Sequence, residues 1–316
     1  MSDALPKIDL HRHLDGSIRL ETILELGLEN DLPLPGRTLE TLRPFVVVSG
    51  PQPGLMAFLA KFEWMVGVLV DAAACRRAAY ENMEDAKREG LDYVELRFSP
   101  VFMARSHGLD PRAVVEAVLD GVSAGARDFG VPAKLIGILS RTFGVESCTR
   151  ELDALLAYRD GLAAIDLAGD EGNFPPELFT EHFRKARDAG LAVTVHAGEA
   201  GGAEGIWSAI RDLGATRIGH AVRALEDPAL LDYFAEHRIG LECNLTSNVQ
   251  TSTVPDYASH PLRGFLERGL LATINTDDPG ISGIDLAYEY EIAAPAAGLS
   301  AELVAQARRN AAAIAF

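Results

Sequence analysis

Leu191-Ala-Val-Thr-Val-His196 is followed by an amphipathic segment at 203–213 and then by a second short run, Arg217-Ile-Gly-His220. The first run is rich in β-branched residues, which is typical of parallel strands that are covered on both faces. The segment between the runs has helical periodicity and is followed by Gly214, a residue type that commonly ends helices. This stretch therefore predicts one strand–helix–strand unit.

The same alternation of short apolar and longer amphipathic segments extends along the chain. Eight strands alternating with helices predict an α/β fold, a closed (β/α)8 TIM barrel rather than an open sheet. The 316 residues fit such a barrel, so we expect a single catalytic domain over 1–316. The predicted strands are 8–13, 93–98, 134–139, 163–167, 192–196, 217–220, 240–244 and 272–275.

The connection between the first two predicted strands is much longer than the others. It contains helical patterns at 20–28, 55–70 and 72–89, and we expect these extra helices to cover one end of the barrel. Lys61 and Glu63 make 55–70 too polar for a membrane span, so it is predicted to be a buried helix. Further helices are predicted at 111–129, 176–189, 203–213, 228–237 and 301–315. The last has no capping residue at its C-terminal end, as expected of a chain that continues.

Composition narrows the class of partner. The net charge of −17, from 46 acidic and 29 basic residues, argues against binding to nucleic acid or to an anionic membrane. Cys75, Cys148 and Cys243 form no C-x-x-C motif, and Met1–Lys7 shows no signal peptide. We therefore expect a cytoplasmic enzyme with a small-molecule substrate. No sequence pattern indicates an oligomeric state.

Histidines cluster at the predicted strand ends, where catalytic groups gather in a barrel. His11 and His13 are two residues apart on one strand, so both side chains point to the same face. His196 ends another strand, and Asp277 follows the last one. Three imidazoles and one carboxylate suit Zn²⁺, so the sequence predicts one zinc ion bound by these four residues.

Hydrolytic chemistry at such a zinc site needs groups that move protons. His220, at the end of the sixth predicted strand, can accept a proton from water. Glu199, three residues after His196, can donate one to the group under attack. The alternative for Glu199 is an acidic residue that complements the dipole of the following helix. Asp277 and Asp278 have a similar alternative, as a turn or a helix N-cap.

These residues lie in segments that resemble the adenosine deaminase family of metal-dependent amidohydrolases, and the overall run looks most similar to the bacterial members. The segments occur in the order typical of that family and span nearly the whole chain. They are Lys7-Ile-Asp-Leu-His-Arg-His-Leu-Asp-Gly16, Tyr93-Val-Glu-Leu-Arg-Phe-Ser-Pro100, Asp166-Leu-Ala-Gly-Asp-Glu171, His196-Ala-Gly-Glu199, Arg217-Ile-Gly-His220, Leu245-Thr-Ser-Asn-Val-Gln-Thr251 and Asn275-Thr-Asp-Asp-Pro279.

The resemblance implies zinc-dependent deamination of adenosine, and of 2′-deoxyadenosine, to inosine and ammonia. It implies that Glu199 protonates purine N1 and that His220 positions the attacking water or takes its proton. It further implies that Asp278 contacts N7 and that the backbone N–H of Gly169 contacts N3. Asp15 would contact the ribose, with His13 nearby.

Four enzyme alternatives and one binding alternative can be compared with the sequence. AMP as the substrate is disfavoured, because no Arg/Lys cluster or glycine-rich phosphate-binding loop lies near the motifs. Adenine deaminase shares the zinc ligands, but its first motif typically has glutamate where this chain has the shorter Asp15. A binuclear hydrolase needs a lysine after the fourth strand, where Asp166-Leu-Ala-Gly169 stands. The cytidine deaminase motifs H-x-E and P-C-x-x-C are absent from the sequence. A binding protein that has lost catalysis would lack one of the six ligand and acid–base residues, and all six are present.

Overall fold

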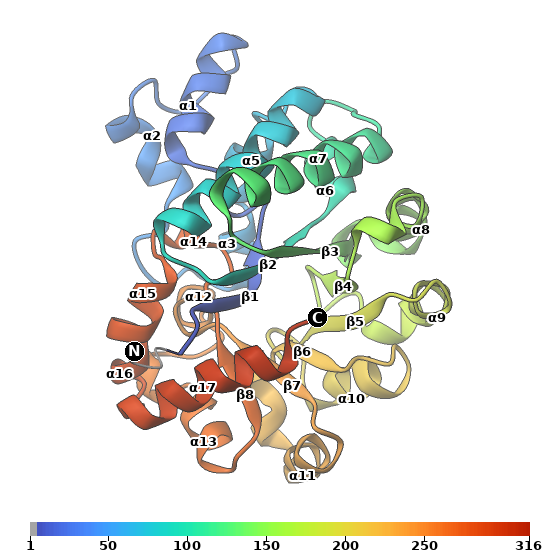
Figure 1. Cartoon of the computed structure of the whole chain (residues 1–316), viewed down its shortest axis with the longest axis vertical. Helices are drawn as coiled ribbons and strands as arrows, with labels where there is room; N and C mark the ends of the chain where they lie inside the picture. Colours follow the sequence, from blue (N-terminus) through green and yellow to red (C-terminus); the bar gives the residue numbers. More distant parts are fainter. Residues whose placement is uncertain (1–4) are drawn as a thin grey trace.

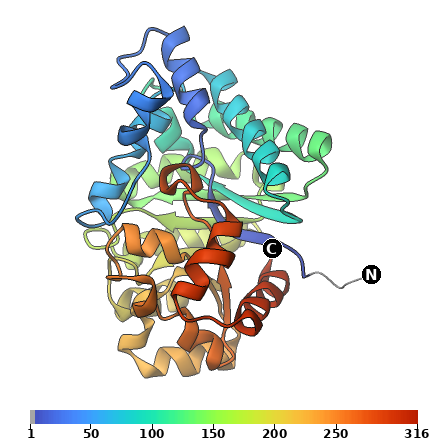
Figure 2. The same ribbon diagram turned by 90° about the vertical axis from the view of Figure 1, so that its left-hand side faces the viewer.

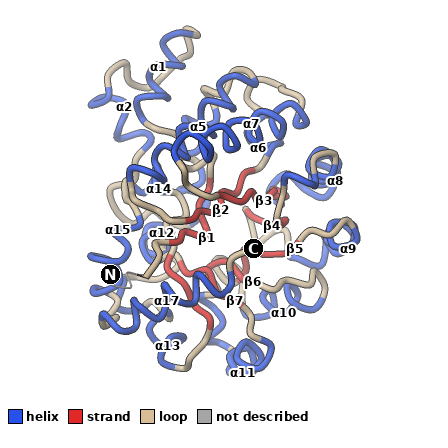
Figure 3. The backbone as a smooth tube through the Cα atoms, viewed as in Figure 1, coloured by secondary structure: helices blue, strands red, loops and turns tan. Residues whose placement is uncertain are grey.

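Eight parallel strands pair in chain order and form the centre of the molecule. In Figure 3 the strands lie at the centre and the helices surround them. Residues 5–316 are described in this computed structural model. Residues 1–4, which belong to the Met1–Lys7 segment and to the predicted 1–316 domain, lie outside the described residues. The strands are β1 Ile8–His13, β2 Tyr93–Phe98, β3 Ala133–Ser140, β4 Ala164–Ala168, β5 Ala192–Ala197, β6 Arg217–His220, β7 Gly240–Cys243 and β8 Leu271–Ile274.

Helices between successive strands form the outer layer, as the sequence predicts for a (β/α)8 barrel (Figure 1). Several begin with Asp or Ser as N-cap; Asp110, for example, accepts a hydrogen bond from the N–H of Arg112. The helices after β2 and before β8 are α6 Pro100–Ala104, α7 Pro111–Phe129, α8 Gly144–Leu156, α9 Thr180–Asp188, α10 Ala203–Arg211, α11 Pro228–His237, α12 Leu245–Gln250 and α13 Leu262–Glu267. After β8 come α14 Pro279–Ser282, α15 Leu286–Tyr288, α16 Ala294–Ala296 and α17 Ala301–Ile314. No helix within residues 5–316 is long and apolar enough to cross a membrane.

The long β1–β2 connection forms extra helices, which lie at the top of Figure 2 in blue. They are α1 Leu20–Glu29, α2 Leu39–Val46, α3 Leu55–Leu59, α4 Phe62–Val66 and α5 Ala72–Arg88. The prediction of one buried helix over 55–70 is wrong, because the segment forms the two short helices α3 and α4. Met56 is also exposed, since this segment borders a cavity. Helix α2 was not predicted, because it contains Pro44, a residue that normally breaks helices.

The barrel closes at a seam between β1 and the segment after β8. Arg12 and Asp277 form an isolated parallel bridge there. The N–H of His13 donates to the carbonyl of Asp277 at 2.7 Å, and the N–H of Asp277 donates to the carbonyl of His11 at 2.8 Å. The side-chain oxygen of Asn275 accepts from the N–H of Leu10 at 3.1 Å. Asp277 is thus fixed directly beside the β1 histidines.

Buried charged side chains fill part of the barrel interior, where branched apolar residues usually dominate. Arg97 on β2 pairs with Asp166 on β4 at 2.8 Å and with Glu242 on β7 at 2.7 Å. Arg217 on β6 pairs with Glu242 at 2.6 Å and with Glu95 on β2. Each charge has an opposite partner, as burial at this depth requires. This network supports the residues above it at the mouth of the barrel.

Candidate active site

Three imidazole nitrogens and one carboxylate oxygen converge at the mouth of the barrel. Nε2 of His196 lies 3.0 Å from Nε2 of His11 and 3.1 Å from Nε2 of His13. Oδ1 of Asp277 lies 3.2 Å and 3.3 Å from the same two atoms of His11 and His13. Tetrahedral coordination with metal–ligand bonds of about 2.0–2.1 Å places ligand atoms about 3.3 Å apart. Each of these four distances fits two ligands of one metal ion. His220 also belongs to a group of possible ligands, with His11, His196 and Asp277, whose donor atoms all lie within 4.8 Å of one another.

Two carboxylates fix the direction in which these histidines present their lone pairs. Nδ1 of His11 lies 2.8 Å from Glu242, and Nδ1 of His196 lies 2.9 Å from Asp166. A carboxylate only accepts hydrogen bonds, so each Nδ1 donates and each Nε2 carries a lone pair. Burial lowers the pKa of His196 to about 4, which keeps that ring neutral. Two lone pairs 3.0 Å apart repel each other, so this donor set fits a cation between them.

His220 borders the same space but lies farther from the four atoms. Its Nε2 is 3.8 Å from Oδ2 of Asp277 and 3.7 Å from Oε2 of Glu199. The His220 backbone has φ 65°, in the left-handed region, which turns the chain sharply at the end of β6. Gly219 precedes it, and a Cβ there would come within 2.9 Å of the His11 ring. His13 is thus the better third ligand on distance, and His220 is a neighbour of the site.

Glu199 lies in the loop after β5, and 8% of its side chain is exposed. Burial raises its pKa well above the ordinary range, and the nearby charges of Asp277 and Glu171 add to this shift. The side chain therefore holds its proton to a higher pH than an ordinary glutamate does, which suits a group that donates a proton. The loop precedes α10, whose first-turn acidic residue is Glu204. Glu199 is thus not the acidic residue that complements the helix dipole.

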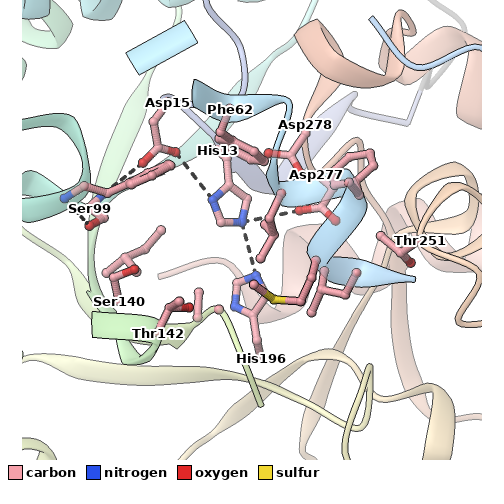
Figure 4. Close-up of a pocket in the computed structure, with 18 of the residues that line it drawn as sticks. His13, Asp15, Phe62, Ser99, Ser140, Thr142, His196, Thr251, Asp277 and Asp278 are labelled. Atoms are coloured by element: carbon pink, nitrogen blue, oxygen red, sulfur yellow. Dashed lines mark hydrogen bonds and ion pairs between the residues drawn. The ribbon is translucent and has the colours of Figure 1, made fainter. Parts of the chain in front are cut away.

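A cavity of about 320 Å³ opens above these groups, within the size range of small-molecule sites. Figure 4 shows His13 between Asp15, Asp277 and His196 in its wall. Eight of the nine sequence-predicted site residues line it, and the ninth, His11, lies beneath with its Nε2 at the site. The eight are His13, Asp15, Gly169, His196, Glu199, His220, Asp277 and Asp278. Apolar side chains line the rest, among them Leu55, Phe58, Phe62, Phe102, Ile138 and Phe143.

Two carboxylates in the wall have oxygen atoms without a hydrogen-bond partner among the described residues. These atoms are Oδ1 of Asp15 and Oδ1 of Asp278, and both are buried. The other oxygen of Asp15 accepts from the N–H of Ser99 at 3.2 Å. Asp278 stands at the N-cap position of α14, as the N-cap alternative expects, but its side chain makes no capping bond there, so the carboxyl group is left for another contact. Burial and the charge of Asp277 raise the pKa of Asp278 well above its ordinary range, so it can donate a hydrogen bond.

The chain matches the sequence model of the family described as "Adenosine deaminase" over residues 6–316. The chain belongs to the adenosine deaminase family. A relative named adenosine deaminase from Edwardsiella ictaluri is 61% identical over 311 residues, which cover 98% of this chain and 93% of the relative. An adenosine deaminase from Klebsiella pneumoniae is 61% identical over 316 residues, which cover 100% of this chain and 95% of the relative.

Solved structures resemble this adenosine deaminase family member at lower identity. The crystal structure of an adenine deaminase from Arthrobacter aurescens has a TM-score of 0.89 and 29% identity, and covers 98% of this chain and 93% of that chain. A cog1816 amidohydrolase from Burkhoderia ambifaria with bound Zn has a TM-score of 0.87 and 27% identity. The match covers 97% of this chain and 84% of that chain. The identity to relatives named adenosine deaminase is about twice the identity to the adenine deaminase, so the adenine deaminase alternative is not favoured.

Sequence reasoning missed the residues that support this adenosine deaminase family site. Asp166 and Glu242 orient two histidines, and Arg97 contacts both carboxylates. Each is a charged residue inside an otherwise apolar strand, which was the available signal. Glu171 was also missed. Its carboxylate accepts from four consecutive backbone N–H groups, those of Gly198, Glu199, Ala200 and Gly201, at 2.7–3.1 Å.

Replacing Glu171 with Gln is expected to loosen the loop that carries Glu199. A glutamine has one acceptor oxygen where the carboxylate has two, so some of the four N–H groups lose their partner. A buried unsatisfied group costs about 1–3 kcal/mol, so we expect the free energy of unfolding to fall by that amount. Urea unfolding measures this loss. Glu177→Gln, an exposed carboxylate that accepts only from Ser208, is the matched control and should unfold like the parent. Equal unfolding of Glu171→Gln and the parent would contradict this role.

Proposed function

We propose that this chain catalyses the hydrolytic deamination of adenosine and 2′-deoxyadenosine to inosine or 2′-deoxyinosine and ammonia, with one zinc ion per chain. The observation that carries the proposal is the convergence of histidine lone pairs and Asp277 beside a buried, protonated Glu199. The 59–61% identity to curated relatives named adenosine deaminase supports the substrate. The alternative function, deamination of free adenine, has less support than deamination of adenosine.

We propose His11, His13, His196 and Asp277 as the zinc ligands. Neutral imidazoles and a carboxylate are the donor types that zinc prefers in catalytic sites. Zinc supplies Lewis acidity when bound, and lowers the pKa of water toward neutrality. Asp166 and Glu242 hold two of the rings in the orientation that binding requires.

Glu199 is the proposed general acid. Its raised pKa keeps a proton on the carboxyl group at neutral pH. Transfer of that proton to purine N1 draws electron density from C6, which makes C6 more open to attack by water. Such a transfer typically contributes about 10²–10⁴ in rate. Of the two protons of the water, one restores the Glu199 carboxyl group and the other goes to the 6-amino group. That group then leaves as ammonia, and the oxygen of the water remains on C6.

Three residues are proposed to hold the substrate. A protonated Asp278 donates a hydrogen bond to N7, which has only a lone pair to offer. Gly169 presents its backbone N–H to N3 with φ 109°, and a Cβ there would meet Oγ1 of Thr142 at 2.3 Å. Asp15, whose buried Oδ1 makes no hydrogen bond among the described residues and lies 3.6 Å from Nδ1 of His13, accepts from a ribose hydroxyl. The partner is thus a small purine nucleoside.

We also propose that residues 1–316 form one catalytic domain and that the enzyme works in the cytoplasm. Strands of the one barrel span the chain from Ile8 to Ile274. All three cysteines are free and buried, which suits a reducing compartment.

The test of the function is the ultraviolet change on incubating zinc-loaded protein separately with adenosine, adenine and AMP, with ammonia assayed in parallel. We expect turnover of adenosine and little turnover of the other two. Turnover of adenine alone would overturn the nucleoside assignment. Silence on all three substrates, with zinc bound, would overturn the proposed function.

Asp15→Glu is expected to lower kcat/KM for adenosine by about 10–100-fold, because the longer side chain occupies the space of the ribose. A fall of 10–100-fold equals about 1.4–2.7 kcal/mol of lost transition-state stabilisation. Steady-state kinetics with adenosine measures this fall in kcat/KM. Asp15→Asn keeps the size and removes only the charge, so its loss should be smaller. An unchanged kcat/KM in Asp15→Glu would contradict the ribose contact.

A further inference from the structure

A chain of hydrogen bonds between buried side chains leads from His220 away from the cavity. Nδ1 of His220 faces the side-chain nitrogen of Asn248 on α12 at 2.9 Å. The side-chain oxygen of Asn248 faces Nε2 of His260 at 3.1 Å. Nδ1 of His260 in turn faces the backbone N–H of Leu262 at 3.1 Å. His220, Asn248 and His260 are all at least nine-tenths buried, so water does not compete for these bonds.

The bond at the outer end of this chain, between Leu262 and His260, fixes the direction of every other hydrogen bond in it. A backbone N–H can only donate, so Nδ1 of His260 accepts from Leu262. Burial lowers the pKa of His260 to about 3, so its ring is neutral. A neutral ring whose Nδ1 accepts has its proton on Nε2. Nε2 of His260 therefore donates to Asn248, and the atom of Asn248 that receives this bond is its oxygen.

The amide group of Asn248 is thereby held in one orientation. With its oxygen toward His260, its NH₂ group points to Nδ1 of His220 and donates to it. The side-chain nitrogen of Asn244 also faces that Nδ1, at 3.4 Å. Nδ1 of His220 is thus an acceptor, and the single proton of the neutral ring is on Nε2. This tautomer is the reverse of that of His11 and His196, whose Nδ1 atoms donate to carboxylates.

We propose that His260 and Asn248 are positioning residues that hold His220 in the Nε2–H tautomer, so that His220 acts as a hydrogen-bond donor and not as the base. The inference rests on the proposed function for its kinetic consequence alone. A protonated Nε2 has no lone pair, so it can neither take a proton from water nor bind a metal ion. The second point agrees with His13, not His220, as the third imidazole ligand.

The donor at Nε2 points into the space where water must sit to attack C6. The two carboxylate oxygens beside it, Oε2 of Glu199 at 3.7 Å and Oδ2 of Asp277 at 3.8 Å, are too far for direct hydrogen bonds. Nε2–H is therefore free to donate to the oxygen of the attacking water and to orient its remaining lone pair toward C6. The proton that the water loses goes to the Glu199 carboxylate, which has just given its own proton to N1. Proton balance thus requires no base at His220.

Nitrogen NMR of protein labelled with ¹⁵N in the histidine rings tests the tautomer directly, because protonated and unprotonated ring nitrogens have well-separated shifts. The spectra are recorded for zinc-loaded and metal-free protein. His220 and His260 are assigned by the signals lost in His220→Gln and His260→Gln. We expect Nε2 protonated and Nδ1 unprotonated in both rings. A proton on Nδ1 of His220 in the parent protein would overturn the proposal.

Asn248→Asp reverses the inner bond with almost no change in shape. A carboxylate accepts at both ends, so it accepts from His260 and draws a proton onto Nδ1 of His220. We expect the NMR signal of His220 Nδ1 to become that of a protonated nitrogen. We also expect kcat to fall by about 10²-fold, the loss that misplacement of a reacting group can cause, with KM and zinc content unchanged. Unchanged shifts and an unchanged kcat would overturn the proposal.

Two comparisons separate this role from a structural one. His260→Gln keeps an N–H at the position of Nε2 and should keep both the His220 tautomer and kcat, whereas His260→Leu removes the donor and should lose both. Asn310→Asp puts a carboxyl group at a buried asparagine that contacts only the carbonyls of Leu270 and Ala272, and should leave His220 unchanged. If the parent does not deaminate adenosine, the proposed function fails, but the NMR still decides the tautomer.

Discussion

Glu199→Gln is expected to lower kcat for adenosine by about 10³-fold or more, while zinc content and the free energy of unfolding stay close to those of the parent. Glutamine has the size of glutamic acid but no acidic proton, so N1 is not protonated and C6 is attacked in its unactivated form. General acid catalysis alone typically contributes about 10²–10⁴. Steady-state kinetics and metal analysis of the same preparation measure the effect.

The pH dependence supplies a second measurement on Glu199. Burial and the neighbouring carboxylates raise the pKa of Glu199, so the active, protonated form is present at neutral pH and is lost as the pH rises through that pKa. The parent should therefore lose kcat on the alkaline side, and Glu199→Gln should not show this loss. Glu204→Gln, an exposed acidic residue on the following helix, is the control and should behave like the parent. A Glu199→Gln variant with kcat near that of the parent would disprove the acid role.

His196→Gln is expected to remove stoichiometric zinc and to lower kcat by about 10³-fold or more, since Lewis-acid stabilisation is worth several kcal/mol. His196 is the one ligand on β5, and its Nε2 lies 3.0–3.1 Å from those of His11 and His13. Metal analysis after dialysis and competition with a chelator measure the loss. Treatment of the parent with the chelator should produce the same inactive state, and added zinc should reverse it.

Asp166→Asn should have a weaker effect than His196→Gln, because Asp166 contacts Nδ1 of His196 and is not a proposed ligand of the ion. Loss of such a supporting contact typically weakens metal affinity by about 10–100-fold, so we expect a partial effect. His182→Gln is the matched control: His182 is also buried, but it bonds to Thr149 on the outside of the barrel. Full zinc retention in His196→Gln would contradict the ligand assignment.

Local sequence patterns were sufficient to predict the barrel strands. All eight observed strands begin and end within one residue of the predicted ranges, and β1, β2 and β6 match them fully. These strands are short β-rich runs bounded by turn residues, so their signal is local. The prediction of one helix over 55–70 was wrong because apolar residues of this segment line the cavity, and Met56 is exposed. They do not form one continuous buried helix face.

The predicted site residues could be found because each stands at a strand end in a recognisable motif. Their supporting partners could not. Glu242 contacts His11, and Asn248 contacts His220, only after strands that are distant in the chain have curled into a barrel. A lone acid within the 240–244 run signals an interior partner, but nothing in the sequence says which residue it meets. Pairings of this kind depend on tertiary geometry.

The seam between β1 and β8 gives the metal a second consequence, which concerns chain closure. His11 and His13 stand near one end of the chain and Asp277 near the other, and the isolated Arg12–Asp277 bridge is what joins the two edges there. Contacts between such distant residues form late and slowly, because the loop between them must first lose its freedom. An ion bound by both edges would stabilise the junction between β1 and the segment after β8, which forms last. In metal-free chains we therefore expect this junction to open first.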